Sequence, residues 1–117
     1  MPSSACFLLL RSKLEHGSVS YCLETFHGEP GPNETVRDSG TMTFALPGGT
    51  IRARVSIVQR FGADGIHARQ ALKGTLVGGT GRYAHAAGTI TGGGTEVENP
   101  PGTIDSQHLR YVIRAPG

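Results

Sequence analysis

Apolar and polar side chains alternate with a period of two over residues 50–61. Ile51 and Val55 fall on one parity of this segment. Arg52 and Arg54 fall on the other. Because successive side chains of a strand point to opposite faces, the pattern predicts a strand with one dry face and one hydrated face. A helix of the same sequence would spread its arginines around the whole circumference.

Two neighbouring segments extend this strand into a meander. Residues 62–65 read Gly-Ala-Asp-Gly, which is a turn sequence, and residues 66–77 alternate again, so a hairpin is predicted. Upstream, residues 41–46 also alternate, and Pro-Gly-Gly at residues 47–49 joins them to the first strand. Residues 41–77 therefore predict three antiparallel strands.

Four weaker segments complete the predicted sheet, over residues 5–10, 18–26, 84–95 and 107–114. Between the second of them and the meander, residues 27–39 are rich in Pro, Gly and charged side chains and predict a polar loop. The four segments and the meander make about seven strands. An eighth would require the glycine-rich segment 84–95 to split in two, or a strand to be missing at the N-terminus, where residues 1–17 form a short or irregular one.

Antiparallel strands with one apolar face each can hide both their faces and their edges by closing into a barrel. About eight strands leave room for packed side chains or for one small ligand. The length of 117 residues suits one domain. We therefore expect an all-β, antiparallel up-and-down β-barrel of about eight strands, with residues 1–117 as a single domain.

Charge and cysteine content narrow the class of protein further. The net charge of +2 is too small for the concentrated basic patch that nucleic acid requires, so no nucleic-acid partner is expected. The apolar run at residues 6–10 is shorter than a signal peptide or a membrane span, so no membrane partner is expected either. We interpret Cys6 and Cys22 as inert thiols in a reducing compartment, which predicts a cytoplasmic location.

Three groups of residues are candidates for chemistry. The glycine run at residues 78–81 is similar to part of a dinucleotide-binding fingerprint, but the residues after it break a helix, so a structural turn is favoured. The histidines do not fall at metal-ligand spacings, and no metal or cofactor is expected. Glu96, Glu98 and Asp105 flank a Pro-Pro loop, where solvated side chains are favoured over a pair for acid–base catalysis.

The inward parity of the predicted strands carries aliphatic side chains with a few polar tips. Either these side chains fill a closed core in which each polar tip finds a partner, or they line a lumen that holds a ligand. The candidate ligand-binding residues are Phe44, Val55, Ile57, Gln59, Ile66, Leu72, Leu109 and Ile113. The candidate catalytic residues are Tyr21, Gln70 and Tyr111. The opposite parity carries arginines, which indicate a hydrated exterior or else an oligomer surface or anion-binding face.

Two motifs resemble one known superfamily. Residues 46–51 read Leu-Pro-Gly-Gly-Thr-Ile, and residues 78–90 read Gly-Gly-Thr-Gly-Arg-Tyr-Ala-His-Ala-Ala-Gly-Thr-Ile. Both are similar to the strand entry and the corner of the allene oxide cyclase barrel and dirigent-like superfamily, over roughly residues 40–114. The resemblance implies an eight-stranded antiparallel barrel with an apolar cavity, no metal and mostly no cofactor. It also implies catalysis by holding one conformer of a substrate.

Three functions follow as hypotheses. The first is a cofactor-independent cyclase or isomerase that acts on a hydrophobic small molecule in the barrel lumen. The second is a non-catalytic binding protein for an apolar metabolite. The third is a solid barrel that acts as an oligomerising interaction module, and a homo-oligomer, either a dimer or a trimer, is expected.

Overall fold

The computed structural model describes residues 6, 8–99 and 104–114. Within this part the chain forms seven strands and one short 3-10 turn. The elements in chain order are β1 (Leu8–Leu14), β2 (Gly17–His27), β3 (Thr35–Leu46), β4 (Gly49–Phe61), β5 (His67–Gly79), η1 (Gly81–Tyr83), β6 (Gly88–Glu98) and β7 (Ile104–Arg114).

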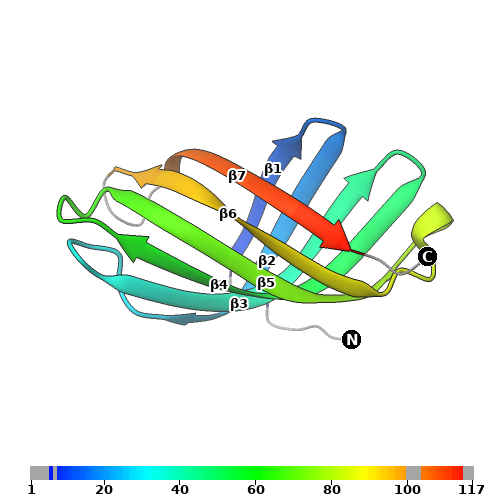
Figure 1. The fold of residues 1–117 in the computed structure, drawn as a ribbon, viewed down its shortest axis with the longest axis horizontal. Helices are drawn as coiled ribbons and strands as arrows, with labels where there is room; N and C mark the ends of the chain where they lie inside the picture. Colours follow the sequence, from blue (N-terminus) through cyan, green and yellow to red (C-terminus); the bar gives the residue numbers. More distant parts are fainter. Residues whose placement is uncertain (1–5, 7, 100–103, 115–117) are drawn as a thin grey trace.

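The strands form one antiparallel meander in which each strand pairs with its neighbours in sequence. The sheet curls about its long axis into a half-barrel (Figure 1). The all-β antiparallel fold is thereby confirmed, but a closed barrel of eight strands is not observed. Within the described residues β1 pairs with β2 alone and β7 with β6 alone, so the sheet has two free edges. An antiparallel sheet twists with every strand, and this twist produces the curl without closing it.

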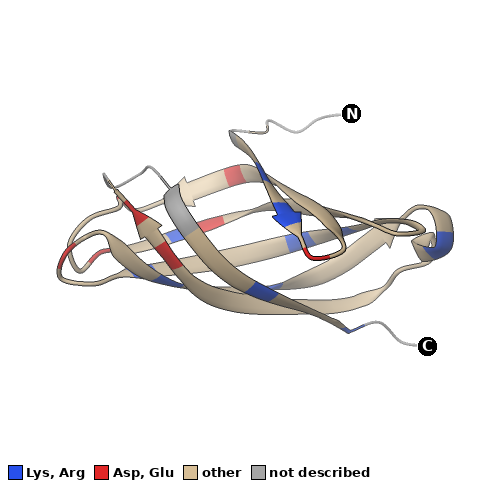
Figure 2. Cartoon of the chain, turned by 90° about the horizontal axis from the view of Figure 1, so that it is seen from above, with Lys and Arg blue, Asp and Glu red and all other residues tan. Residues whose placement is uncertain are grey.

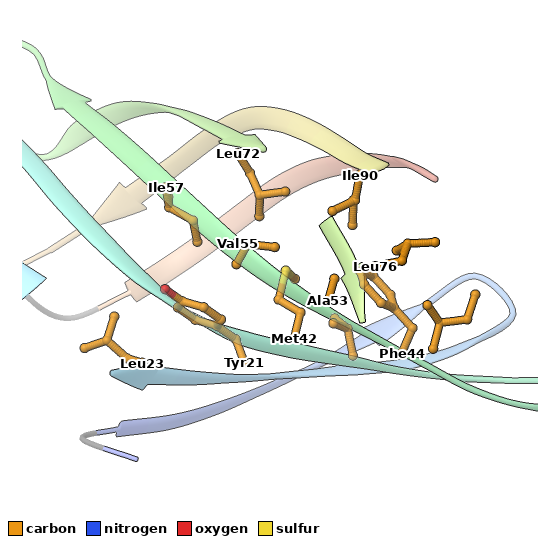
Figure 3. Packing of buried hydrophobic residues seen from close by; sticks show 12 residues of the cluster. Tyr21, Leu23, Met42, Phe44, Ala53, Val55, Ile57, Leu72, Leu76 and Ile90 are labelled. Carbon is orange, nitrogen blue, oxygen red and sulfur yellow. The ribbon is translucent and has the colours of Figure 1, made fainter. Parts of the chain in front are cut away.

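The alternation of residues 50–61 predicts the faces of β4 correctly. Val55 and Ile57 are buried in the main core, whereas Arg52 and Arg54 are exposed. Because paired residues of an antiparallel ladder share a face, the register carries this division across the sheet. We call the side that holds the buried set the inner face and the opposite side the outer face. Figure 3 shows the apolar side chains of the inner face packed against one another.

Several strand boundaries differ from the predictions. The hairpin of β4 and β5 is confirmed, and the glycine-rich segment is the single strand β6 rather than two. The predicted loop at residues 27–39 is wrong in its second half, because β3 already begins at Thr35. At the N-terminus the strand runs over Leu8–Leu14 instead of residues 5–10, of which 5 and 7 lie outside the described residues.

The glycine-rich corner is a structural turn, as predicted. The Gly81 φ angle is +61°, and a Cβ atom there would lie 2.2 Å from the carbonyl oxygen of Gly48. The Arg82 N–H donates to that same carbonyl at 2.9 Å, and the Thr80 N–H donates to the Thr50 carbonyl at 2.9 Å. The corner between β5 and β6 is thus fastened to the turn between β3 and β4. Glycine is required here because only glycine combines a left-handed backbone with such a close approach.

Cys6 and Cys22 form a disulfide in the structure, with their Cα atoms 5.3 Å apart. The interpretation of these residues as two separate thiols is therefore wrong. The two positions are brought together because Cys22 pairs with Leu9, which places β2 beside the chain just after Cys6. The sequence alone could not show this pairing, since it depends on the register of β1 against β2.

Candidate functional site

The inner face lines an open cavity of about 470 Å³. This volume lies in the range of small-molecule sites. The apolar side chains that line it are Leu10, Val19, Leu23, Phe26, Pro30, Met42, Ile57, Leu72 and Leu109. The polar side chains that line it are Ser12, Tyr21, Asp38, Gln59, Gln70, Glu98, Gln107 and Tyr111. Since β1 and β7 both contribute, the cavity extends across the gap between the two free edges of the sheet.

The predicted site residues fall into two groups. All three candidate catalytic residues, Tyr21, Gln70 and Tyr111, line the cavity. Four candidate ligand-binding residues also line it: Ile57, Gln59, Leu72 and Leu109. The others do not line it: Phe44 and Val55 are buried in the core, Ile113 packs against that core, and Ile66 is half-buried just before β5.

Phe44 lies in the core behind Tyr111, which lines the cavity. Its side chain is 1% exposed and meets the ring of Tyr111 edge to face, with the ring centroids 5.4 Å apart. Burial raises the pKa of Tyr111, because the phenolate form would lose its hydration. The core side chains thus leave the cavity unfilled. Tyr111 lines the cavity and carries a neutral hydroxyl group.

A phenol and a carboxyl group meet at one end of the cavity. Tyr21 on β2 donates a hydrogen bond from its hydroxyl to Asp38 Oδ1 on β3, at 2.7 Å. Both side chains are buried, at 8% exposure each. Burial raises the pKa of Asp38, the bond from Tyr21 lowers it, and the charge of Glu98 raises it, so that the net direction is upward. Burial and the Asp38 contact also raise the pKa of Tyr21, which keeps its donor proton in place.

A second group of acids and amides lies beside this pair. Gln59 on β4 donates through Nε2 to Glu96 Oε1, and it donates to Glu98 Oε2 at 3.3 Å. Gln107 on β7 donates through Nε2 to Glu96 Oε2 at 2.9 Å. Glu96 and Glu98 are 2% and 4% exposed and are hydrogen-bonded to each other. Glu98 faces the cavity, and Glu96 stands behind it in the wall.

Burial is the largest influence on the pKa of Glu96. It raises the pKa of Glu96 to about 7, against the lowering effect of the Gln107 bond, and the contact with Glu98 raises it further. Two carboxyl groups in contact cannot both ionise cheaply in a dry site. Near neutral pH Glu96 can therefore hold or release a proton.

One polar atom of the cavity wall lacks a partner. The Oε1 atom of Gln70 is buried and makes no hydrogen bond within the described part of the chain. Gln70 pairs with Gln59 across β4 and β5, so its side chain belongs to the same polar end of the cavity. A buried acceptor without a donor costs about 1–3 kcal/mol, and a ligand that supplied a donor would recover this cost.

Charge is segregated between the two faces of the sheet. Every Lys and Arg side chain is exposed, and those on strands alternate with inner-face residues, as with Arg69 before Gln70. Figure 2 shows these cationic positions spread along the curled sheet. On the outer face Arg54 Nη2 lies 3.3 Å from Glu24 Oε1. The buried carboxyl groups of Asp38, Glu96 and Glu98 thus lie on the inner face, and the arginine and lysine side chains of the strands lie on the outer face.

The buried carboxyl groups were missed or misplaced by the sequence interpretation. Glu96 and Glu98 were expected in a solvated loop, which is wrong, because β6 continues to Glu98. Their shared parity with the buried Ile90 was the available signal. Asp38 fell in the predicted polar loop and was not considered. The side chain of Asp105 lies outside the described residues.

Other classes of site are restricted by the described residues. No three of their His, Cys, Asp and Glu side chains are grouped closely enough to hold a metal ion. In the same part of the chain no helix is long and apolar enough to cross a membrane. Comparison of the chain with family models, with curated proteins and with solved structures gave no match. The site must therefore be interpreted from its own chemistry.

Proposed function

We propose that this chain is a cofactor-independent isomerase or cyclase that holds a hydrophobic small molecule in the inner cavity. The observation that carries the proposal is the cavity itself, whose lining is largely apolar and includes the carboxyl group of Glu98, which interacts with Glu96, a buried residue whose pKa is raised to about 7. Apolar walls bind the body of a ligand, and a few polar groups orient it. Orientation alone contributes up to about 7–11 kcal/mol in favourable cases.

The chemistry would be a proton transfer without net change in composition. Glu98, at the cavity wall, would give a proton to an oxygen or carbon of the ligand and take one back from another position. Glu96 would act as a positioning residue, because it interacts with Glu98 but does not face the cavity. Burial raises the pKa of Glu96 to about 7, and a carboxyl group with such a pKa beside Glu98 is suited to store the proton between the two halves of the step.

The second candidate function is binding without chemistry. It is favoured by the two free edges, since β1 and β7 leave the cavity wall without a continuous backbone ladder on that side. The allene oxide cyclase-like barrel and the homo-oligomer remain parts of the proposal, whereas the disulfide favours an oxidising compartment over the cytoplasm.

Binding is tested with Nile red, a neutral dye whose fluorescence rises in apolar surroundings. We expect Leu109→Trp to reduce dye binding strongly, because the larger side chain occupies the cavity. The matched control is Val112→Trp, at an exposed position on the same strand β7, which should bind the dye like the unaltered protein. If the dye does not bind, or binds equally to both variants, the proposal is wrong.

Turnover is tested by incubating the protein with apolar epoxides and polyenes. The products are then searched by mass spectrometry for compounds of unchanged mass and altered retention time. We expect Glu98→Gln to abolish turnover while Nile red still binds. Dye binding without any turnover by the unaltered protein would favour the second candidate function.

A further inference from the structure

The two outermost strands of the sheet carry backbone groups that no other described strand uses. Within the described residues β1 pairs with β2 alone and β7 with β6 alone. The N–H and C=O groups of alternate residues in each strand therefore point into the gap between the two edges. The backbone hydrogen bonds of the described turns and loops do not reach β1 or β7 either. Such an edge is a template for an added strand.

The two edges lie close enough together to line a common groove of about 390 Å³. Its lining includes Lys13 and Leu14 of β1 and Leu109 and Tyr111 of β7. The inner cavity reaches the same gap, since Leu10 of β1 and Leu109 both line it. An added strand in this groove would therefore find apolar neighbours on its inner side.

The outer side of both edge strands is basic. Arg11 and Lys13 of β1 alternate with inner-face residues, and so do Arg110 and Arg114 of β7. All four side chains are exposed, and none takes part in an ion pair with a described residue. Like charges directly opposite one another on paired strands destabilise a sheet. A second copy of the chain, whose edges carry the same cations, is therefore disfavoured as the neighbour of either edge.

Carboxylates that could neutralise these cations are few. Among the described outer-face side chains of β1, β2, β6 and β7, the only carboxylate is that of Glu24, and its Oε1 atom lies 3.3 Å from Arg54 Nη2. In the turn after β1, Glu15 Oε1 lies 3.7 Å from His16 Nε2. The cations of the two edges are thus left to pair with acidic groups of a partner.

We propose that the gap between β1 and β7 binds an extended segment of another protein in which apolar and acidic residues alternate. The segment adds a strand to the sheet, so that main-chain hydrogen bonds give affinity and alternate side chains give specificity. Its apolar side chains face Leu14 and Leu109 on the inner side, because successive side chains of a strand point to opposite faces. Its acidic side chains face Arg11, Lys13 and Arg110 on the outer side. The proposal concerns the backbone edges and does not depend on the chemistry of the inner cavity.

The test measures the binding of labelled peptides to the protein, with its disulfide intact, by fluorescence polarisation. The peptides have blocked ends and the length of β1, seven residues. One alternates glutamate with valine, the second alternates lysine with valine, and the third repeats the first with every valine nitrogen methylated. We expect the glutamate peptide to bind at least about tenfold more tightly than the lysine peptide, because charges on neighbouring strands interact. The methylated peptide should also bind about tenfold more weakly or worse, since it lacks backbone donors.

Two charge reversals locate the peptide at the edges. Arg11→Glu and Arg110→Glu should each weaken binding of the glutamate peptide by about fivefold or more and strengthen binding of the lysine peptide. The gain for the lysine peptide also shows that each variant is folded. The matched control is Arg69→Glu, which makes the same charge change at an exposed position of the central strand β5. At about 0.15 M salt, where charges more than about 8 Å apart are largely screened, this control should bind both peptides like the unaltered protein.

Hydrogen exchange of the complex tests whether the backbone takes part. We expect the glutamate peptide to slow exchange of the β1 and β7 amides and to leave those of β4, which pairs on both sides, unchanged. The proposal is wrong if the glutamate peptide does not bind, binds no better than the lysine peptide, or binds without this protection. Equal losses in Arg69→Glu and Arg110→Glu would also contradict it.

Sedimentation of the protein without peptide tests the competing occupant. If the chain self-associates and Arg110→Glu or Arg11→Glu abolishes the association, a second copy fills the gap, and the proposal is wrong. We expect neither variant to change the mass of the unaltered protein in solution. Nile red binding to the inner cavity is measured separately, so failure of the peptide leaves the proposed function standing.

Discussion

Replacing Glu96 with Gln should remove most of the pH dependence of stability in the weakly acidic range. Burial raises the pKa of Glu96 from 4.5 to about 7 in the folded protein. Between these two values the folded chain keeps a proton that the unfolded chain has already released. The contribution of Glu96 to the free energy of unfolding is therefore complete below pH 4.5 and is lost as the pH rises through 7.

The size of the effect follows from the same two values. One proton contributes about 1.4 kcal/mol for each pH unit that separates the folded and unfolded pKa. The difference between 4.5 and about 7 would give about 3 kcal/mol. Since the hydrogen bonds around Glu96 relax when its charge forms, we expect a fall of about 2–3 kcal/mol.

The assay is urea unfolding at constant salt between about pH 4 and pH 8, with the disulfide kept oxidised. A Gln side chain at position 96 stays neutral throughout and can still donate to Glu98, so its profile should be nearly flat, with a small slope left from Asp38. Glu24→Gln, on the outer face, controls for the change of carboxylate to amide. Parallel profiles for the unaltered protein and Glu96→Gln would refute the reasoning.

Three further predictions concern the fold. Phe44→Ala should lower the free energy of unfolding by about 3–5 kcal/mol, because a side chain that is 1% exposed leaves a cavity; urea unfolding measures the loss. Reduction of the Cys6–Cys22 disulfide, which spans 16 residues, should cost about 3 kcal/mol, measured in the same way with a reducing agent. Gly81→Ala should lower the melting temperature through a cost of at least about 1–2 kcal/mol, because the φ angle is +61°; a melting temperature equal to that of the unaltered protein would contradict the role of this corner.

The alternation of side chains was sufficient to predict the faces of the central strands. Ile57 and Arg54 lie where their parity places them, because burial of an apolar side chain and hydration of an arginine act on each residue locally. The meander of β3, β4 and β5 followed from turn residues between alternating segments. The extent of closure could not be predicted in this way, since curl is a property of the whole sheet.

The buried carboxyl groups could not be predicted from their own surroundings in sequence. Glu96 is tolerated inside because Gln59 and Gln107 donate to it, and these residues are 37 and 11 positions away. Tyr21 meets Asp38 at a separation of 17 positions. Each of these contacts exists only once the register of the strands is fixed. A carboxyl group near a Pro-Pro segment therefore resembled a loop residue until its partners were known.

The described part of the chain has an odd number of strands, which restricts how the gap between β1 and β7 could be bridged. Direction reverses at every step of an antiparallel meander, so the first and seventh strands cross the sheet in the same sense. Joining β1 directly to β7 would require a parallel ladder, in which the bonds are slanted. A single additional strand running the opposite way would meet both edges as an antiparallel neighbour. The direction of an added strand therefore decides whether it can pair in antiparallel fashion with both β1 and β7 and so close the gap between them.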